Sequence, residues 1–317
     1  MAKGNSTGDG KGEPAPDQMF GCSANLTGEI HDHLKFLSVL SIFLSISAFL
    51  GNSVILVCLH KVSSLHPPTK LLLRCLATTD LFVGLISGPL AVIYWTSAMN
   101  ERWNICRYVF VSGLIIGYAL CGVSLLTVTA MSVDKLLALS LGLRYRQVVT
   151  LKRTLLVVVL FWVICIVFSA TFVENYLTAV RTSYVVITLC LVTSVFCYTK
   201  IFLALRRHQT QVQDSVHQEQ PGRTIPMNVV RYRKAVSSAL WLQFTIIVCY
   251  LPHGVVSALS THSGLSPTVS LVRQFTVALI FLNSTLNPIL YCCKLREVRQ
   301  AVKETFEQIL FSPSSSV

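Results

Sequence analysis

The chain has 317 residues, of which 53% are hydrophobic and only 13% are charged, and its mean hydropathy is +0.62. Soluble domains carry about 25% charged residues, so this composition excludes an ordinary soluble protein. The net charge of +12 would suit a nucleic-acid-binding protein, but 19 of the 26 Lys and Arg residues fall in alternate loops between apolar stretches. We therefore expect no nucleic-acid partner.

Residues 1–35 are polar, rich in Gly, Asp and Pro, and form a predicted N-terminal tail. They lack the apolar run of a secretory signal peptide, so we expect the first span to direct membrane insertion. Asn5-Ser6-Thr7 and Asn25-Leu26-Thr27 are glycosylation sequons, and Asn5 and Asn25 are candidate acceptors if this tail is extracellular.

Seven apolar stretches follow the tail. A hydrocarbon core about 30 Å thick needs about 20 residues of helix, and lipid offers no partner for free backbone groups. The predicted spans are 36–60, 69–95, 105–136, 154–172, 182–206, 233–260 and 270–293. The sequence therefore predicts an all-α membrane protein with a seven-transmembrane helix bundle over residues 36–293.

The distribution of basic residues predicts the orientation. With the N-terminus outside, the 19 alternate-loop Lys and Arg residues lie on the cytoplasmic side, where positive charge is retained during insertion. We expect a multi-pass protein of the plasma membrane with an extracellular N-terminus. The basic inner face favours anionic membrane lipids or an acidic cytosolic partner.

Residues 294–317 form the predicted cytoplasmic end. Leu295, Val298 and Val302 recur at spacings of three and four among charged residues, which indicates a short amphipathic helix on the inner leaflet. Cys292 and Cys293 precede it and are candidate palmitoylation sites.

Several polar residues occur inside the predicted spans, among them Asp80, Ser124, Asn283 and Asn287. A carboxylate at bilayer depth is costly, so Asp80 should face the bundle interior and have partners. Two interpretations remain open: a structural hydrogen-bond network, or a cation site made of one carboxylate and neutral oxygens.

Short motifs, one set for most spans and in a fixed order, resemble those of the rhodopsin-like (class A) G-protein-coupled receptors. They are Gly51-Asn52, Leu76-Ala77-Thr78-Thr79-Asp80, Trp162, Tyr198, Cys249-Tyr250-Leu251-Pro252 and Asn287-Pro288-Ile289-Leu290-Tyr291. The resemblance implies a receptor, not an enzyme, that acts through a heterotrimeric G protein, with arrestin and a receptor kinase as further partners.

The resemblance also implies roles for the matched residues. Asp80, Ser124, Asn283 and Asn287 match the residues that enclose an allosteric sodium ion, and no other cofactor is expected. The expected switch residues are Tyr198, Tyr250, Pro252, Asn287, Pro288 and Tyr291. Proline removes an intrahelical hydrogen bond and bends its helix, which suits Pro252 and Pro288 to a moving element.

The expected G-protein face departs from the family pattern. The usual Asp-Arg-Tyr at the inner end of the third span reads Asp134-Lys135-Leu136, and Arg233 and Lys234 at the base of the sixth span have no acidic neighbour. Lysine keeps the charge but lacks the planar fork of donors. A non-signalling decoy or scavenger of the same fold is therefore an alternative, and a seven-span transporter is a weaker one.

Two cysteines lie on the predicted outer side, Cys22 in the tail and Cys106 near the start of the third span. The family usually ties this span to the second extracellular loop, but residues 173–181 contain no Cys. A Cys22–Cys106 bridge and two free thiols are the alternatives.

The ligand is constrained mainly by exclusion. Gly117 stands where amine receptors place Asp, and Phe281 stands where visual pigments place the retinal-binding Lys. The short second extracellular loop and Cys190 in place of the fifth-span Pro resemble the melanocortin and adenosine branch. The candidate ligand-binding residues are Gly113, Gly117, His253, Arg273 and Phe281. They favour a neutral or acidic small molecule or lipid, unless Arg273 is only a solvated charge.

Overall fold

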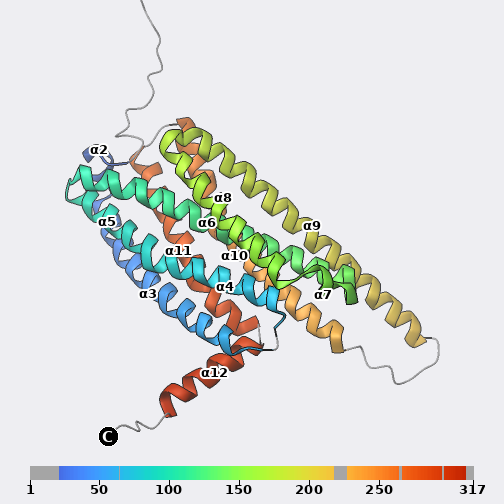
Figure 1. The fold of residues 1–317 in the computed structure, drawn as a ribbon. Coiled ribbons are helices and arrows are strands. Elements are labelled where there is room, and N and C mark those ends of the chain that lie inside the picture. The colour runs from blue at the N-terminus through green and yellow to red at the C-terminus, as the bar shows by residue number, and fades with distance from the viewer. Residues whose placement is uncertain (1–20, 64, 218–226, 264–265, 295, 312–317) are drawn as a thin grey trace, which may run out of the picture.

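The computed structural model describes residues 21–63, 65–217, 227–263, 266–294 and 296–311. Within these ranges every regular element is a helix, which confirms the predicted fold class (Figure 1). The elements are α2 (Ala24–Thr27), α3 (His31–Lys61), α4 (Pro67–Phe82), η1 (Val83–Ser87), α5 (Gly88–Met99), α6 (Trp103–Leu141), η2 (Gly142–Arg144), α7 (Tyr145–Val148), α8 (Leu151–Glu174), α9 (Tyr176–His217), α10 (Met227–Ser263), α11 (Pro267–Lys294) and α12 (Arg296–Phe311).

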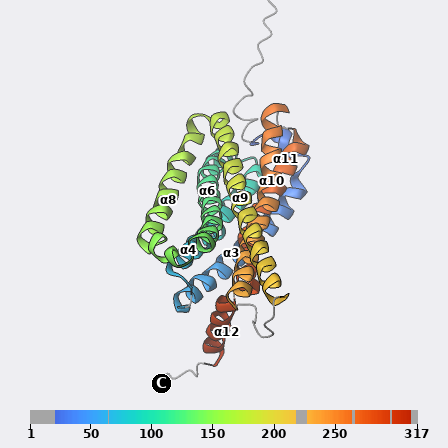
Figure 2. The same ribbon diagram turned by 90° about the vertical axis from the view of Figure 1, so that its right-hand side faces the viewer.

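Seven helical runs among the described residues are long and apolar enough to cross a membrane. They are α3, the continuous runs α4–η1–α5 and α6–η2–α7, the parts Leu151–Phe172 of α8, Thr178–Ala204 of α9 and Leu240–Ser260 of α10, and α11. Both views show these helices side by side in one bundle, with α12 turning away at the end far from α2 (Figures 1 and 2). The chain is a multi-pass membrane protein.

Apolar side chains cover the outside of the bundle and polar ones lie inside. Phe43 is 66% exposed and Val167 is 63% exposed, whereas Asn52, Asp80 and Asn283 are completely buried. This distribution fits a bundle surrounded by hydrocarbon, where outward apolar groups need no cover and intramembrane polar groups must find partners inside.

The second span is closely packed against α3 and contains a π-helical turn, η1. A Cβ added to Gly88 would lie 1.8 Å from the Ser45 hydroxyl oxygen, so only glycine permits this approach. Pro89 follows at the start of α5. Its ring lacks an N–H and would clash with the carbonyl four residues earlier, which explains why the helix widens here.

The fifth span begins earlier than predicted. The expected loop over residues 173–181 is reduced to Asn175, between the end of α8 at Glu174 and the start of α9 at Tyr176. Asn175 caps α9, because its side-chain oxygen accepts a hydrogen bond from the Thr178 backbone N–H at 3.1 Å. The prediction of a span beginning at residue 182 overlooked this cap.

The amphipathic helix after the seventh span is present as α12. Ala301 is buried against Cys58 and Val62 of the first span and its flanking loop, and Val298 is buried in the main apolar cluster together with Ile55 and Tyr291. The side chains of Leu295, Phe306, Ile309 and Leu310 lie outside those the structure describes. Of the two candidate palmitoylation sites, Cys292 is partly buried and Cys293 is exposed.

Candidate functional site

A cavity of about 490 Å³ lies within the bundle. It is lined by side chains from the second to the seventh span, and its size falls within the range of about 300–1,000 Å³ that is typical of ligand sites. All five residues predicted to contact a ligand line it: Gly113, Gly117, His253, Arg273 and Phe281.

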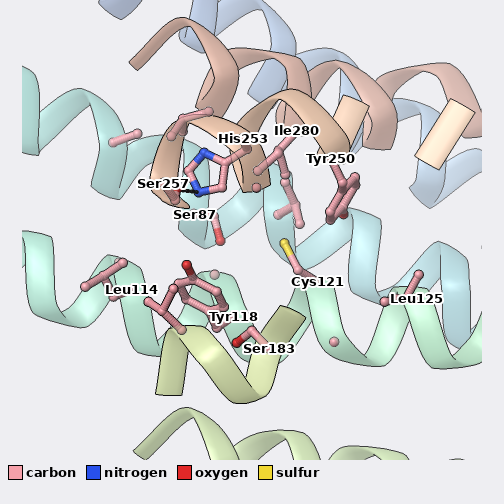
Figure 3. A pocket seen from close by; sticks show the side chains of 18 of the residues that line it. Ser87, Leu114, Tyr118, Cys121, Leu125, Ser183, Tyr250, His253, Ser257 and Ile280 are labelled. Carbon is pink, nitrogen blue, oxygen red and sulfur yellow. Dashed lines mark hydrogen bonds between the residues drawn. The ribbon is translucent and has the colours of Figure 1, made fainter. Parts of the chain in front are cut away.

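The walls of the cavity come from opposite sides of the bundle. Figure 3 shows Tyr118 of α6 and Ser183 of α9 facing His253 and Tyr250 of α10, with the Cys121 sulfur between the two walls. Aromatic and aliphatic groups dominate the lining. A Cβ added to Gly113 or Gly117 would meet nothing within 4 Å, so these glycines leave open space along α6.

Arg273 is not the solvated loop-end charge considered above, because its side chain is only 7% exposed. Its guanidinium lies over the Phe110 ring, with the guanidinium carbon 5.5 Å from the ring centroid. Next to it on α11, the side-chain oxygen of Gln274 accepts a hydrogen bond from the Trp95 indole N–H at 2.9 Å.

A polar cluster lies in the middle of the bundle and contains the predicted sodium ligands. The Asp80 Oδ2 oxygen accepts a hydrogen bond from the Asn287 side-chain amide at 2.7 Å. Ser124 is hydrogen-bonded to Thr79, the neighbour of Asp80, with 2.8 Å between the hydroxyl oxygens. Asn283 is fully buried one helical turn before Asn287 on α11.

The cluster fits a monovalent cation by its donor set. Several buried oxygens have no hydrogen-bond partner among the described residues, including Asp80 Oδ1, Asn283 Oδ1, Ser284 Oγ and Asn287 Oδ1. One carboxylate with neutral oxygens suits a hard cation of low charge. The described residues contain no group of three His, Cys, Asp or Glu side chains that would hold a transition metal.

The predicted switch residues are placed on three helices. Pro252 lies inside α10 and Pro288 inside α11. Tyr250, two residues before Pro252, lines the cavity. The hydroxyls of Tyr198 and Tyr291 are not joined here, because Tyr198 bonds to Ser132 at 3.0 Å and the Tyr291 hydroxyl is buried without a partner.

The C-terminal end of α6 is held by a network around Asp134, which is 5% exposed. Its Oδ1 oxygen accepts a hydrogen bond from the Tyr145 hydroxyl, and its Oδ2 oxygen accepts one from Thr69 at 2.9 Å. Lys135 Nζ lies 3.5 Å from the same Oδ2 oxygen. The side chains of Arg233 and Lys234, predicted for this face, lie outside those the structure describes.

Cys22 and Cys106 form a disulfide, with their Cα atoms 6.0 Å apart. It joins the segment before α3 to the first turn of α6 and lies in a buried cluster with Trp95. Of the two predicted glycosylation sites, Asn5 lies outside the described residues, and Asn25 is in α2 with an undescribed side chain.

Several residues that contact these sites were not predicted from the sequence. Tyr145 is the first residue of α7, shortly after α6, and no local pattern links it to Asp134. Thr79 was noted only as part of a motif, although it connects Ser124 to the Asp80 region. Thr276 and Ser257 flank His253, and the spacing of four from His253 to Ser257 on a helix would have indicated that contact.

Comparisons with known proteins agree with this arrangement. The chain matches the family described as 7 transmembrane receptor (rhodopsin family) over residues 51–179 and 171–291. It is 22% identical over 280 residues to melanocortin receptor 5 of Mus musculus, covering 82% of this chain and 81% of the relative. It is 25% identical over 294 residues to adenosine receptor A3 of Ovis aries, covering 85% and 87%.

The fold has a counterpart among solved structures. It superposes on the crystal structure of squid rhodopsin with a TM-score of 0.69 and 15% sequence identity, over 90% of this chain and 89% of the other. The relatives confirm the predicted resemblance to the melanocortin and adenosine branch.

Proposed function

Because the chain belongs to the rhodopsin family of seven-transmembrane receptors, we propose that it transmits the binding of an extracellular ligand to a heterotrimeric G protein. The observation that carries this proposal is the position of two sites on one continuous helix. Gly117 of α6 lines the cavity, and Lys135 lies 18 residues further along, about 27 Å away at 1.5 Å per residue. A shift of α6 at the cavity therefore reaches the cytoplasmic end directly.

In this proposal α10, the sixth span, moves further than α6 when a ligand binds. Tyr250 contacts the cavity two residues before Pro252, where the helix lacks one backbone hydrogen bond and bends more easily. A ligand that displaces Tyr250 swings the cytoplasmic half of α10 outward. That movement opens a cleft beside Lys135 for the G protein, and arrestin and a receptor kinase would use the same face afterwards.

The cluster around Asp80 tunes this movement. Asp80, Ser124, Asn283 and Asn287 would hold a sodium ion, which supplies one positive charge to the buried carboxylate. Asp80 and Asn287 connect α4 to α11, so the occupied cluster would favour the packed arrangement of the two helices. The protein itself is not an enzyme in this proposal, because guanine-nucleotide exchange occurs on the G protein.

The proposed location is the plasma membrane, with the N-terminus outside and α12 along the inner leaflet. The basic residues in alternate loops and the oxidised Cys22–Cys106 pair support this orientation, because disulfides persist in the secretory and extracellular compartments.

Nucleotide exchange in membranes from cells that express the chain tests the proposal. We expect ligand-free exchange above that of mock membranes with at least one class of Gα, and lower exchange when sodium replaces a bulky organic cation. A matched Lys135→Arg variant restores the usual planar donor and should raise the maximal rate.

The decoy alternative rests on Lys135, since an ammonium cannot reproduce the fork of a guanidinium. It predicts no exchange with any Gα class, and none after Lys135→Arg. The family match and the fold do not favour the transporter alternative.

A further inference from the structure

The charge inside the cavity has an unusual environment. Arg273 lines the cavity and is 93% buried, yet its Nη2 nitrogen has no hydrogen-bond partner among the described residues. A buried cation without a compensating partner is costly, so such a group normally pairs with an anion. The protein supplies no carboxylate here, because neither Asp nor Glu occurs among the described residues that line the cavity.

The neighbours of Arg273 hold it in place without neutralising it. The Phe110 ring attracts the guanidinium face, with 5.5 Å to the ring centroid. The Tyr94 ring packs against the same Phe110 ring, with 5.5 Å between the two ring centroids. The oxygen of Gln274 is occupied by Trp95 at 2.9 Å. The guanidinium is therefore oriented by aromatic groups and keeps one donor nitrogen free.

The hydrogen bonds of His253 are satisfied by a neutral ring, without a second positive charge. The Thr276 hydroxyl donates to the Arg273 carbonyl at 2.7 Å, so the Thr276 oxygen must accept the proton on His253 Nδ1, 3.0 Å away. The other ring nitrogen, Nε2, is 3.4 Å from the Ser257 hydroxyl, which can donate to it. This chain is complete with a neutral imidazole that carries its proton on Nδ1.

The remainder of the cavity is apolar and extends away from Arg273. Phe281 lies eight residues further along α11, about 12 Å deeper at 1.5 Å per residue, and it lines the same cavity. Leu114, Ile280 and Tyr250 also face the space (Figure 3). The cavity thus has one cationic end near the outer end of α11 and a long apolar interior.

We propose that this cavity binds an amphipathic acid, with its anionic head group on Arg273 and its apolar body directed toward Phe281 and Tyr250. The head group is a carboxylate or a phosphate monoester, since both match the parallel N–H donors of a guanidinium. This inference rests on the proposed receptor function only in taking the cavity as the ligand site. The proposal excludes amines as ligands of the cavity, because Arg273 would repel a second cation placed beside it.

Four compounds that share a chain of twelve carbons test the proposal on the full-length receptor in nanodiscs of zwitterionic lipid. They are dodecanoic acid, dodecyl phosphate, methyl dodecanoate and dodecylamine, and the readout is the rise in the unfolding midpoint with concentration. We expect the acid or the phosphate to bind about 10- to 100-fold more tightly than the methyl ester. This ratio is the usual contribution of a hydrogen bond to a charged group to the affinity. The amine should not raise the midpoint more than the ester does. Whether the acid or the phosphate binds more tightly distinguishes a free fatty acid from a phospholipid-derived ligand.

Two variants localise the effect. Arg273→Gln should abolish the preference for the acids over the ester, whereas Arg102→Gln, which changes an exposed arginine just before α6, should leave it unchanged. If Arg273→Gln does not fold, Arg273→Lys replaces it and should weaken the acids while leaving the ester unaffected.

Equal binding of the acids and the ester, or a preference that survives in Arg273→Gln, would overturn the proposal. This binding assay contains no G protein and is therefore independent of the nucleotide-exchange assay. Binding of the acids here, together with no nucleotide exchange in the membrane assay, would count against the receptor function alone. Exchange driven by a neutral or cationic ligand, with no binding of the acids, would count against this inference alone.

Discussion

Removal of the Cys22–Cys106 bridge should destabilise the half of the receptor that contains α2 and the first turns of α6. The two residues are separated by 84 positions, and closing a loop of that length lowers the entropy of the unfolded chain by the equivalent of about 4.5 kcal/mol at 25 °C. This is an upper value, because the helices inside the loop remain helical in an unfolded membrane-inserted chain and already restrict it. We expect about 2–4 kcal/mol for the variant with both cysteines replaced by Ala.

Loss of the bridge should also weaken ligand binding in the cavity. The bridge lies in the same buried cluster as Tyr94 and Trp95, and both of these also line the cavity. The double Ala variant should therefore unfold at a lower temperature and bind cavity ligands more weakly. A matched control with Cys58 and Cys75 replaced by Ala changes two buried free cysteines and should leave the half that contains α2 and the first turns of α6 intact.

Thiol labelling tests whether Cys22 and Cys106 are joined by a disulfide. With an unfolded, unreduced receptor, neither Cys22 nor Cys106 should react with a maleimide, and both should react after reduction. Labelling of both residues before reduction would refute the bridge and the destabilisation argued from it.

Three further outcomes are expected. Asp80→Asn removes the only charge of the central cluster, so sodium should no longer lower nucleotide exchange in membranes. Burial lowers the pKa of His66 while the nearby Asp134 carboxylate opposes the shift, so the folded protein disfavours the protonated form and loses stability as the pH falls below about 6.5; His66→Gln should flatten the unfolding midpoint between about pH 8 and pH 5. Gly88→Ala forces a Cβ against Ser45 and should cost about 1–3 kcal/mol in thermal unfolding, whereas Gly113→Ala, which meets open space, should cost far less.

The sequence predicted the helices because a membrane imposes a strong, local requirement on each one. Twenty apolar residues in a row identify a span without knowledge of its neighbours. The cost of a carboxylate at bilayer depth predicted that Asp80 faces the bundle interior, and the resemblance placed Asn287 in the same cluster; the structure joins the two directly.

Contacts between distant segments were harder to predict. Nothing around Tyr145 indicates that its hydroxyl reaches Asp134, because the contact depends on how the segment after α6 folds back. The cap at Asn175 and the π-helical turn before Pro89 had local signals, an N-cap residue and a proline, but apolar spacing alone does not detect either. The burial of Arg273 depends on the packing of Phe110 from another helix and has no signature in the sequence.

The most direct test of the central claim is the release of GDP from purified Gα by the purified receptor in nanodiscs. Addition of the receptor should accelerate GDP release above the spontaneous rate for at least one Gα class, and Lys135→Arg should accelerate it further. GDP release at the spontaneous rate for every Gα class, with the wild-type receptor and with Lys135→Arg, in the presence and absence of the twelve-carbon acids, would contradict the account.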